Sequence, residues 1–174
     1  MGIREIGMRF GKWRVSGVMM LAVANGAVAL AAPSAHAQQA EPPYYASIRA
    51  DEARMRTGPG ENYPATWFYR RADLPIRVIA IYGDWRRIED PDGTRGWMFV
   101  NLLSSTRTAM VVRGVAEMRS SPRAGAHVNW RAEPGVVGRI SRCADGWCRF
   151  DVHGRIGYVE QANLWGVDSG ETLP

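Results

Sequence analysis

The sequence has few of the side chains that bind metals or act as nucleophiles. Its 174 residues include two cysteines and three histidines. Zinc needs four ligands, or three and a water, and a nucleophilic cysteine needs a base and an orienting group. The one glycine-rich stretch, Thr57-Gly58-Pro59-Gly60, is typical of a turn rather than of a phosphate-binding loop. We therefore expect no metal, no cofactor and no catalytic residues.

The chain also lacks an apolar run long enough to span a membrane. The longest, Gly17 to Ala32, has 16 residues, whereas a spanning helix needs roughly 20. Basic residues precede this run, and Ala35-His36-Ala37 follows it as a small-x-small cleavage pattern. We expect residues 1–37 to be a signal peptide, cleaved after Ala37, with a retained membrane anchor as the alternative. The expected location is the periplasm or outside the cell, without stable membrane insertion.

Lysine is absent after Lys12, and removal of the leader lowers the net charge. The whole chain is +5, but four of its 22 basic and one of its 17 acidic residues lie in residues 1–37. The remaining chain has 18 basic and 16 acidic residues, a difference of +2. Because these charges are dispersed, the composition does not favour nucleic-acid binding.

What the sequence does contain is an internal repeat of about fifty residues. Four landmarks recur in the same order at nearly constant spacing. They are Met55 and Met118, Trp85 and Trp147, Gly96 and Gly157, and Asn101 and Asn163, with offsets of 63, 62, 61 and 62. A repeat of this length predicts two small domains rather than one enzyme core.

Each repeat is typical of short β-strands separated by turns. β-branched residues favour a strand over 74–82, and turns at 83–84 and 91–93 separate it from strands at 85–88 and 96–100. Repeat 2 follows the same order, with strands at 136–143, 147–152 and 156–159. No stretch after the leader has sustained helical periodicity. The predicted fold class is all-β, with two tandem small barrels in which the tryptophans help to fill small cores.

The two cysteines are placed to face each other across a hairpin. If Asp145-Gly146 is a two-residue turn, Ala144 faces Trp147, and Cys143 faces Cys148 as the next pair. We expect a Cys143–Cys148 disulfide, because such a pair lies within bonding reach and an exported protein meets an oxidising compartment. A metal site or a reactive cysteine is the alternative. Repeat 1 has Ile81 and Arg86 at these positions.

The motifs resemble a bacterial SH3 domain. In repeat 1 they are Met55-Arg56-Thr57-Gly58-Pro59-Gly60, Gly83-Asp84-Trp85, Gly96-Trp97-Met98-Phe99 and Asn101-Leu102; repeat 2 matches more loosely. The resemblance covers nearly all of residues 46–167 and implies two SH3-like barrels. We expect a linker at 38–50, domain 1 at 51–104, a linker at 105–115, domain 2 at 116–167 and a tail at 168–174. Since only that tail follows the repeats, we expect no attached hydrolase and no enzyme activity.

SH3-type surfaces grip extended ligands with exposed aromatic side chains beside turns. The candidate ligand-binding residues are Tyr63, Trp67, Tyr69, Trp85, Trp97 and Trp130. Trp85 and Trp97 recur in repeat 2 as Trp147 and Tyr158, so a shared packing role is the alternative for them. Arginines near these rings could bind carboxylates of a peptide.

The resemblance implies a binding module, since bacterial SH3 domains commonly bind cell-wall peptides or other extended peptides. The expected partner is therefore peptidoglycan or an envelope peptide or protein, and no nucleic acid. The alternative is an envelope adaptor or regulator that binds a single partner protein and no glycan. Repeat 1 is expected to do more of the binding, because it has the fuller glycine-proline loop and more aromatic residues.

Overall fold

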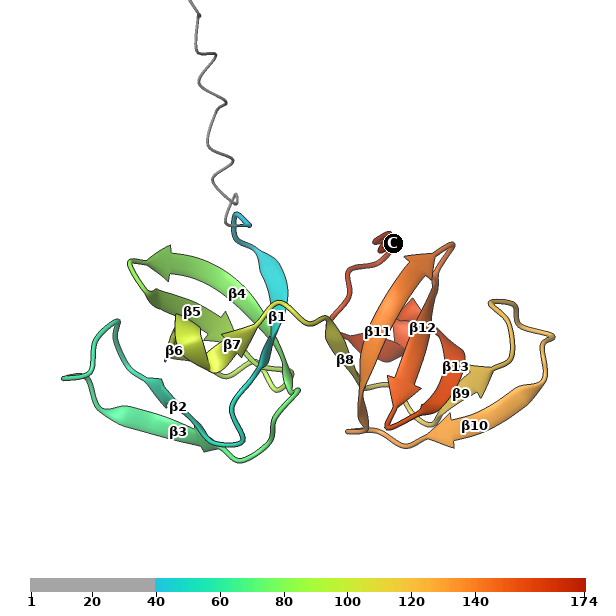
Figure 1. Cartoon of the computed structure of the whole chain (residues 1–174), viewed down its shortest axis with the longest axis horizontal. Coiled ribbons are helices and arrows are strands. Elements are labelled where there is room, and N and C mark those ends of the chain that lie inside the picture. Colours follow the sequence, from blue (N-terminus) through green and yellow to red (C-terminus); the bar gives the residue numbers. More distant parts are fainter. Residues whose placement is uncertain (1–39) are drawn as a thin grey trace, which may run out of the picture. The chain divides into compact units, whose positions relative to one another are not determined.

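Two antiparallel seven-stranded sheets with the same strand order make up the fold of residues 40–174, described in a computed structural model (Figure 1). Residues 1–39 are not described, so the expected signal peptide lies outside the described residues. The first sheet has the order β3-β2-β6-β5-β4-β1-β7 and the second β10-β9-β13-β12-β11-β8-β14. We call them barrel 1 and barrel 2, and the predicted all-β tandem architecture is confirmed.

The elements of barrel 1 are β1 (Tyr44–Ile48), β2 (Ala53–Arg56), β3 (Ala65–Tyr69), β4 (Pro75–Tyr82), β5 (Trp85–Glu89), β6 (Arg95–Phe99), the 3₁₀ turn η1 (Val100–Leu102) and β7 (Leu103–Ser104). Those of barrel 2 are β8 (Thr108–Val111), β9 (Ala116–Arg119), β10 (Val128–Ala132), β11 (Val137–Ala144), β12 (Trp147–Val152), β13 (Arg155–Glu160), η2 (Gln161–Asn163) and β14 (Leu164–Trp165). In these described residues, no helix is long and apolar enough to cross a membrane.

The predicted linkers are wrong in part, because each contains a strand. β1 lies within 38–50 and pairs with β4, while β8 lies within 105–115 and pairs with β11. Both strands contribute fully buried side chains, including Ile48 and Val111. Their sequences are short and follow proline or polar residues, so they lack the turn-bounded alternation that marked the other strands.

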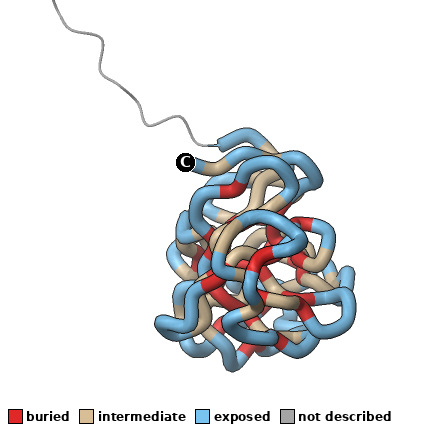
Figure 2. Tube along the Cα trace, turned by 90° about the vertical axis from the view of Figure 1, so that its right-hand side faces the viewer, coloured by how far each residue is buried: buried red, intermediate tan, exposed pale blue. Residues whose placement is uncertain are grey.

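The cores contain no tryptophan among the described residues, contrary to the expectation that tryptophans fill them. The core of barrel 1 is built from Ala46, Ile48, Ala53, Met55, Tyr69, Ile76, Val78, Ile88, Met98 and Leu103. In barrel 2, Phe150 is the largest fully buried side chain. Figure 2 shows such buried segments on the inner parts of the trace, with the turns exposed. The tryptophans are left on the outer faces, where they are available for other contacts.

Gly96 and Gly157 let one strand pass close to another in each barrel. A Cβ at Gly96 would lie 2.5 Å from Met55 Cγ and 2.9 Å from the Arg56 carbonyl oxygen. A Cβ at Gly157 would lie 2.7 Å from Met118 Cβ. The two glycine–methionine pairs recur because the crossing of β2 by β6, and of β9 by β13, has no room for a side chain.

The cysteine hairpin has the predicted register. Cys143 pairs with Cys148, Ala144 pairs with Trp147, and a disulfide joins the cysteines, whose Cα atoms are 4.1 Å apart. Asp145 and Gly146 both have positive φ, at 51° and 80°, as a two-residue turn of this kind requires. Both cysteines are fully buried.

The C-terminal segment 168–174 is part of barrel 2 rather than a free tail. Leu173 forms an antiparallel bridge with Cys143, and its side chain packs against the core. The Arg107 guanidinium donates to both carboxylate oxygens of Glu171, at 2.6 and 3.0 Å. Gln161 donates to the Glu171 carbonyl at 2.7 Å. These contacts hold the segment against the disulfide hairpin.

Gly96→Ala should destabilise the protein by about 1–3 kcal/mol, because the new methyl group overlaps Met55 and the Arg56 carbonyl. Gly125→Ala is the matched control, since a Cβ there meets nothing within 4 Å. Urea unfolding followed by tryptophan fluorescence measures both. Equal stability of the two variants would contradict the packing argument.

Glu171→Gln should lower stability in a pH-dependent way. The Arg107 hydrogen bonds hold the pKa of Glu171 below its ordinary value, although burial opposes this. A lowered folded-state pKa means that the contribution is complete above the unfolded pKa of about 4.3 and is lost as the pH falls through the folded value. We expect a loss of about 1–2 kcal/mol at pH 7 that fades below pH 4. Thermal melts at pH 7 and pH 3 test this, and a loss independent of pH would contradict it.

Candidate functional site

A groove on the outer face of barrel 1 joins an apolar strip to charged side chains. It encloses about 320 Å³. The residues that line it are Glu52, Arg54, Arg56, Glu61, Phe68, Trp85, Phe99 and Leu102. Residues that are distant in the sequence meet here because β2, β5 and β6 lie near one another in the sheet order.

Strand alternation explains which side chains reach the groove. In β2, Met55 faces the core and is 1% exposed, so Arg54 and Arg56 face outward. In β5 and β6, Trp85 and Phe99 are paired outward neighbours. Their rings meet edge to face with centroids 5.5 Å apart, an arrangement that aromatic pairs favour. The groove floor is therefore a fixed aromatic pair on rigid strands.

Phe68 forms the wall on the β3 side, where it pairs across the ladder with Arg54. The guanidinium carbons of Arg54 and Arg70 lie 5.7 and 5.2 Å from the centre of its ring, within cation–π distance. Phe68 is still 38% exposed. An exposed ring bordered by arginines suits a ligand that carries both apolar groups and carboxylates.

Arg56 has a structural role in the loop between β2 and β3. Its guanidinium donates to the carbonyls of Glu61 and Tyr63, at 2.9 and 2.7 Å. Arg119 repeats this contact in barrel 2, donating to the Ala126 carbonyl at 2.7 Å. A contact present in both barrels indicates a structural role for Arg56. Of the two arginines that line the groove, Arg54 is therefore the one whose charge is available to a ligand.

Tyr63 packs on the glycine-proline loop and not in the groove. Added Cβ atoms at Gly58 and Gly60 would lie 2.4 and 3.2 Å from its ring. Barrel 2 replaces Tyr63 by Ala126 and has Ser121 and Arg123 in place of the glycines. Barrel 2 therefore lacks both the tyrosine ring and the glycines that make room for it. In barrel 1, 43% of the Tyr63 surface stays exposed.

Barrel 2 has the corresponding groove, but it is smaller and polar. It encloses about 210 Å³ and is lined by Val115, Glu117, Arg119, Trp147, Glu160 and Asn163. The ladders align Phe68 with Arg131 and Phe99 with Glu160. The 3₁₀ turns start at Val100 and Gln161, so Leu102 corresponds to Asn163 and the expected equivalence of Asn101 with Asn163 is off by one residue.

Part of the charge in the second groove is paired. Glu117 forms ion pairs with Arg119 and with Arg131, the latter at 3.7 Å. Of the apolar side chains that line the first groove, only the tryptophan is kept, as Trp147. The two barrels therefore share a scaffold and differ in the surface that a ligand would meet.

The predicted site residues are only partly brought together. Trp85 lies in the groove. Trp67, 52% exposed, lines an adjoining hollow of about 170 Å³ with Arg54 and Phe68. Trp97 is half-buried on the outer face but does not line the groove. Trp130 in barrel 2 is 47% exposed, with the Arg155 guanidinium 5.4 Å from its ring centre.

Tyr69 is a core residue, so its prediction as a ligand-binding residue is wrong. It is 6% exposed, and its hydroxyl donates to Asp90 Oδ2 at 2.9 Å. Burial, and then this hydrogen bond, raise the pKa of Tyr69 above its ordinary value. Asp90 also accepts from the Asp92 and Thr94 backbone amides, so the pair fixes the turn between β5 and β6.

Sequence reasoning missed Phe68, Phe99, Leu102 and Arg54. Phe68 lies between the candidates Trp67 and Tyr69, and Phe99 lies two residues after the candidate Trp97. The signal that could have found them is their contrast with repeat 2, where charged or polar residues occupy the same positions.

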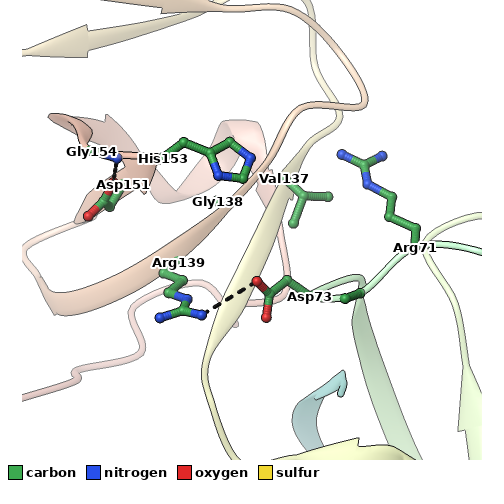
Figure 3. A pocket seen from close by; sticks show the side chains of 9 residues that line it. Arg71, Asp73, Val137, Gly138, Arg139, Asp151, His153 and Gly154 are labelled. Carbon is green, nitrogen blue, oxygen red and sulfur yellow. Dashed lines mark hydrogen bonds and ion pairs between the residues drawn. The ribbon is translucent and has the colours of Figure 1, made fainter. Parts of the chain in front are cut away.

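A second cavity, of about 330 Å³, is polar (Figure 3). Arg139 Nη2 lies 3.6 Å from Asp73 Oδ2 at its edge, and the Arg71 guanidinium donates to the Gly135 carbonyl at 3.1 Å. His153 also points toward it. No Phe, Tyr or Trp side chain lines this cavity, so it lacks the apolar surface of the barrel 1 groove. In residues 40–174, no three His, Cys, Asp or Glu side chains are grouped as metal ligands.

Two small antiparallel barrels in tandem, with the same topology and a groove over equivalent strands, define a pair of SH3-like modules. The family model described as Bacterial SH3 domain matches the chain twice, over residues 49–104 and 112–166. The chain belongs to this family, as its motifs predicted.

The chain is also similar to the solved structures of NlpC1 and NlpC2 from Trichomonas vaginalis. Identity is 13% and 15%, and the TM-scores are 0.34 and 0.33. The matches cover 72% and 75% of this chain but 46% and 52% of those chains, so it spans about half their length. No curated protein matches the chain.

Tyr69→Phe should reduce stability by about 1.5–3 kcal/mol, because it removes a hydrogen bond to a buried carboxylate. It should leave ligand binding unchanged, since Tyr69 does not reach the groove. Chemical denaturation and a binding assay on the same preparation check both statements. Weaker binding without loss of stability would restore Tyr69 as a site residue.

Proposed function

We propose that this protein is a non-catalytic binding module of the cell envelope that recognises cell-wall peptide or another extended peptide through the groove of barrel 1. The observation that carries the proposal is the contrast between the two grooves. Barrel 1 presents Phe68, Phe99 and Leu102 where barrel 2 has Arg131, Glu160 and Asn163.

The groove chemistry supports a peptide ligand. Phe68, Trp85 and Phe99 offer apolar contact for small side chains and for the flat faces of peptide bonds. Arg54 stands at the edge and can pair with a carboxylate of the ligand. Hot spots of binding are commonly aromatic residues and arginine in one cluster, which fits this combination.

The proposed location is the periplasm or the cell exterior. The apolar segment followed by Ala35-His36-Ala37 supports export, and a disulfide at Cys143–Cys148 fits an oxidising compartment. Protein recovered from the producing cell should begin at Gln38, which intact-mass measurement checks. A mass that includes residues 1–37 would favour the anchored alternative.

Exchange of groove residues between the barrels tests the proposed function. Purified protein should co-sediment with isolated sacculi, and F68R/F99E/L102N should weaken this at least tenfold, the equivalent of about 1.4 kcal/mol. Phe68 and Phe99 line the outer groove, whereas Leu102 also packs against the core, so F68R/F99E is measured beside the triple variant. Circular dichroism and thermal melts of both check that the fold survives.

The matched control is the reciprocal variant R131F/E160F/N163L, which changes barrel 2 alone. It should sediment at least as well as the unchanged protein. Equal binding by both variants would reject the barrel 1 groove. No sedimentation of the unchanged protein, together with one dominant partner in a pull-down from envelope extract, would favour the adaptor that binds a single protein.

A further inference from the structure

The outer edge of β11 in barrel 2 is covered by the chain itself. The Arg142 amide donates to the Pro174 carbonyl at 3.0 Å, and the Cys143 amide donates to the Leu173 carbonyl at 3.1 Å. The Leu173 amide returns a hydrogen bond to the Cys143 carbonyl at 2.9 Å. The leucine side chain packs on the core at the same place. An extended segment is thus added to the sheet by backbone hydrogen bonds and one aliphatic anchor.

The corresponding edge in barrel 1 belongs to β4. Ile81 pairs with Arg86 as Cys143 pairs with Cys148, in each case one pair before the turn. Ile81 therefore occupies the position of Cys143, whereas Ala80, opposite Arg87, corresponds to Ser141, opposite Arg149. Arg142 is an extra residue at the register shift of β11. The barrels share their strand order. The end of β4 in barrel 1 is therefore equivalent to the part of β11 that the C-terminal segment covers in barrel 2.

This edge is without a strand partner in the described part of the chain. β1 pairs with β4 only as far as Tyr44 opposite Val78. The preceding residues are Pro43 and Pro42, which have no N–H to extend the ladder. β5 occupies the inner edge of β4, so the outer edge from Ile79 to Tyr82 stays open.

The open edge has one protective feature, a register shift between Val78 and Ala80, but lacks the others. Natural edge strands are blunted by charges, prolines or a covering segment. Ile79, Ala80, Ile81 and Tyr82 include no charge and no proline, and Tyr82 is 66% exposed. In barrel 2 the equivalent stretch carries Arg142 and is covered as well.

We propose that the outer edge of β4 at Ile79–Tyr82 is a second binding site, which accepts an extended peptide by antiparallel strand addition. The occupant is a segment of a partner protein with an aliphatic residue in the position that Leu173 takes in barrel 2. Strand addition draws affinity from main-chain hydrogen bonds and specificity from alternate side chains. The site does not depend on the proposed groove, because none of its four residues lines that groove.

The test is a titration of the isotope-labelled protein, without its leader, with a synthetic peptide that copies residues 168–174. NMR amide shifts should change at Ile79 to Tyr82, and those of Arg142 and Cys143 should stay unchanged because their edge is already covered. A peptide with N-methylleucine in place of leucine lacks one amide donor. It should bind about three- to tenfold more weakly, as expected for one lost hydrogen bond.

A peptide with aspartate in place of leucine should not bind, since the aliphatic anchor is absent. No shift at 5 mM peptide would overturn the proposal. Shifts at Arg142 and Cys143, with release of the chain's own segment, would overturn it in favour of exchange at barrel 2. Concentration-dependent shifts at Ile79 to Tyr82 without peptide would overturn it in favour of a second copy as occupant. Sacculus binding by the same protein is measured separately. Failure of the strand-edge proposal can therefore be told apart from failure of the groove proposal.

Discussion

The close crossing of β2 by β6, and of β9 by β13, is the constraint on which the rest of the structure depends. Gly96 and Gly157 have no side chain there, so Met55 and Met118 can fill the space beneath. The crossing places β6 beside β2 in the first sheet and β13 beside β9 in the second. It also sets the outward faces of these strands next to each other, which is where both grooves lie. Core geometry thereby fixes the place of the surface site.

On this common frame the two barrels have diverged in opposite ways. Barrel 1 keeps an apolar groove and leaves a strand edge open. Barrel 2 has a polar groove in which Glu117 pairs with Arg119 and Arg131, and it covers the same edge with its own segment. Both differences reduce the surface that barrel 2 offers to a partner. The two barrels therefore keep one topology and differ in the surfaces that they present.

Much of the fold could be predicted from the sequence, because it depends on local signals. The repeat, the hairpin at Asp145-Gly146 and the disulfide are set by residues close together in the chain. The strand β1 was missed since its burial comes from long-range pairing with β4. The groove was found only in part: alternation shows that Phe99 faces outward, but not that it meets Trp85. Tyr69 was misassigned because the sequence does not distinguish an aromatic residue of the core from one of a binding surface.

The burial of the disulfide beneath the C-terminal segment has a chemical consequence. A thiolate reduces a disulfide by approaching one sulfur in line with the bond, so it needs an open path. Cys143 and Cys148 are both fully buried, and Leu173 bridges the strand that carries the first. Reductants in the surroundings therefore meet a closed surface as long as barrel 2 stays folded. Exchange with other thiols therefore requires an opening of barrel 2 that exposes one of the two sulfurs.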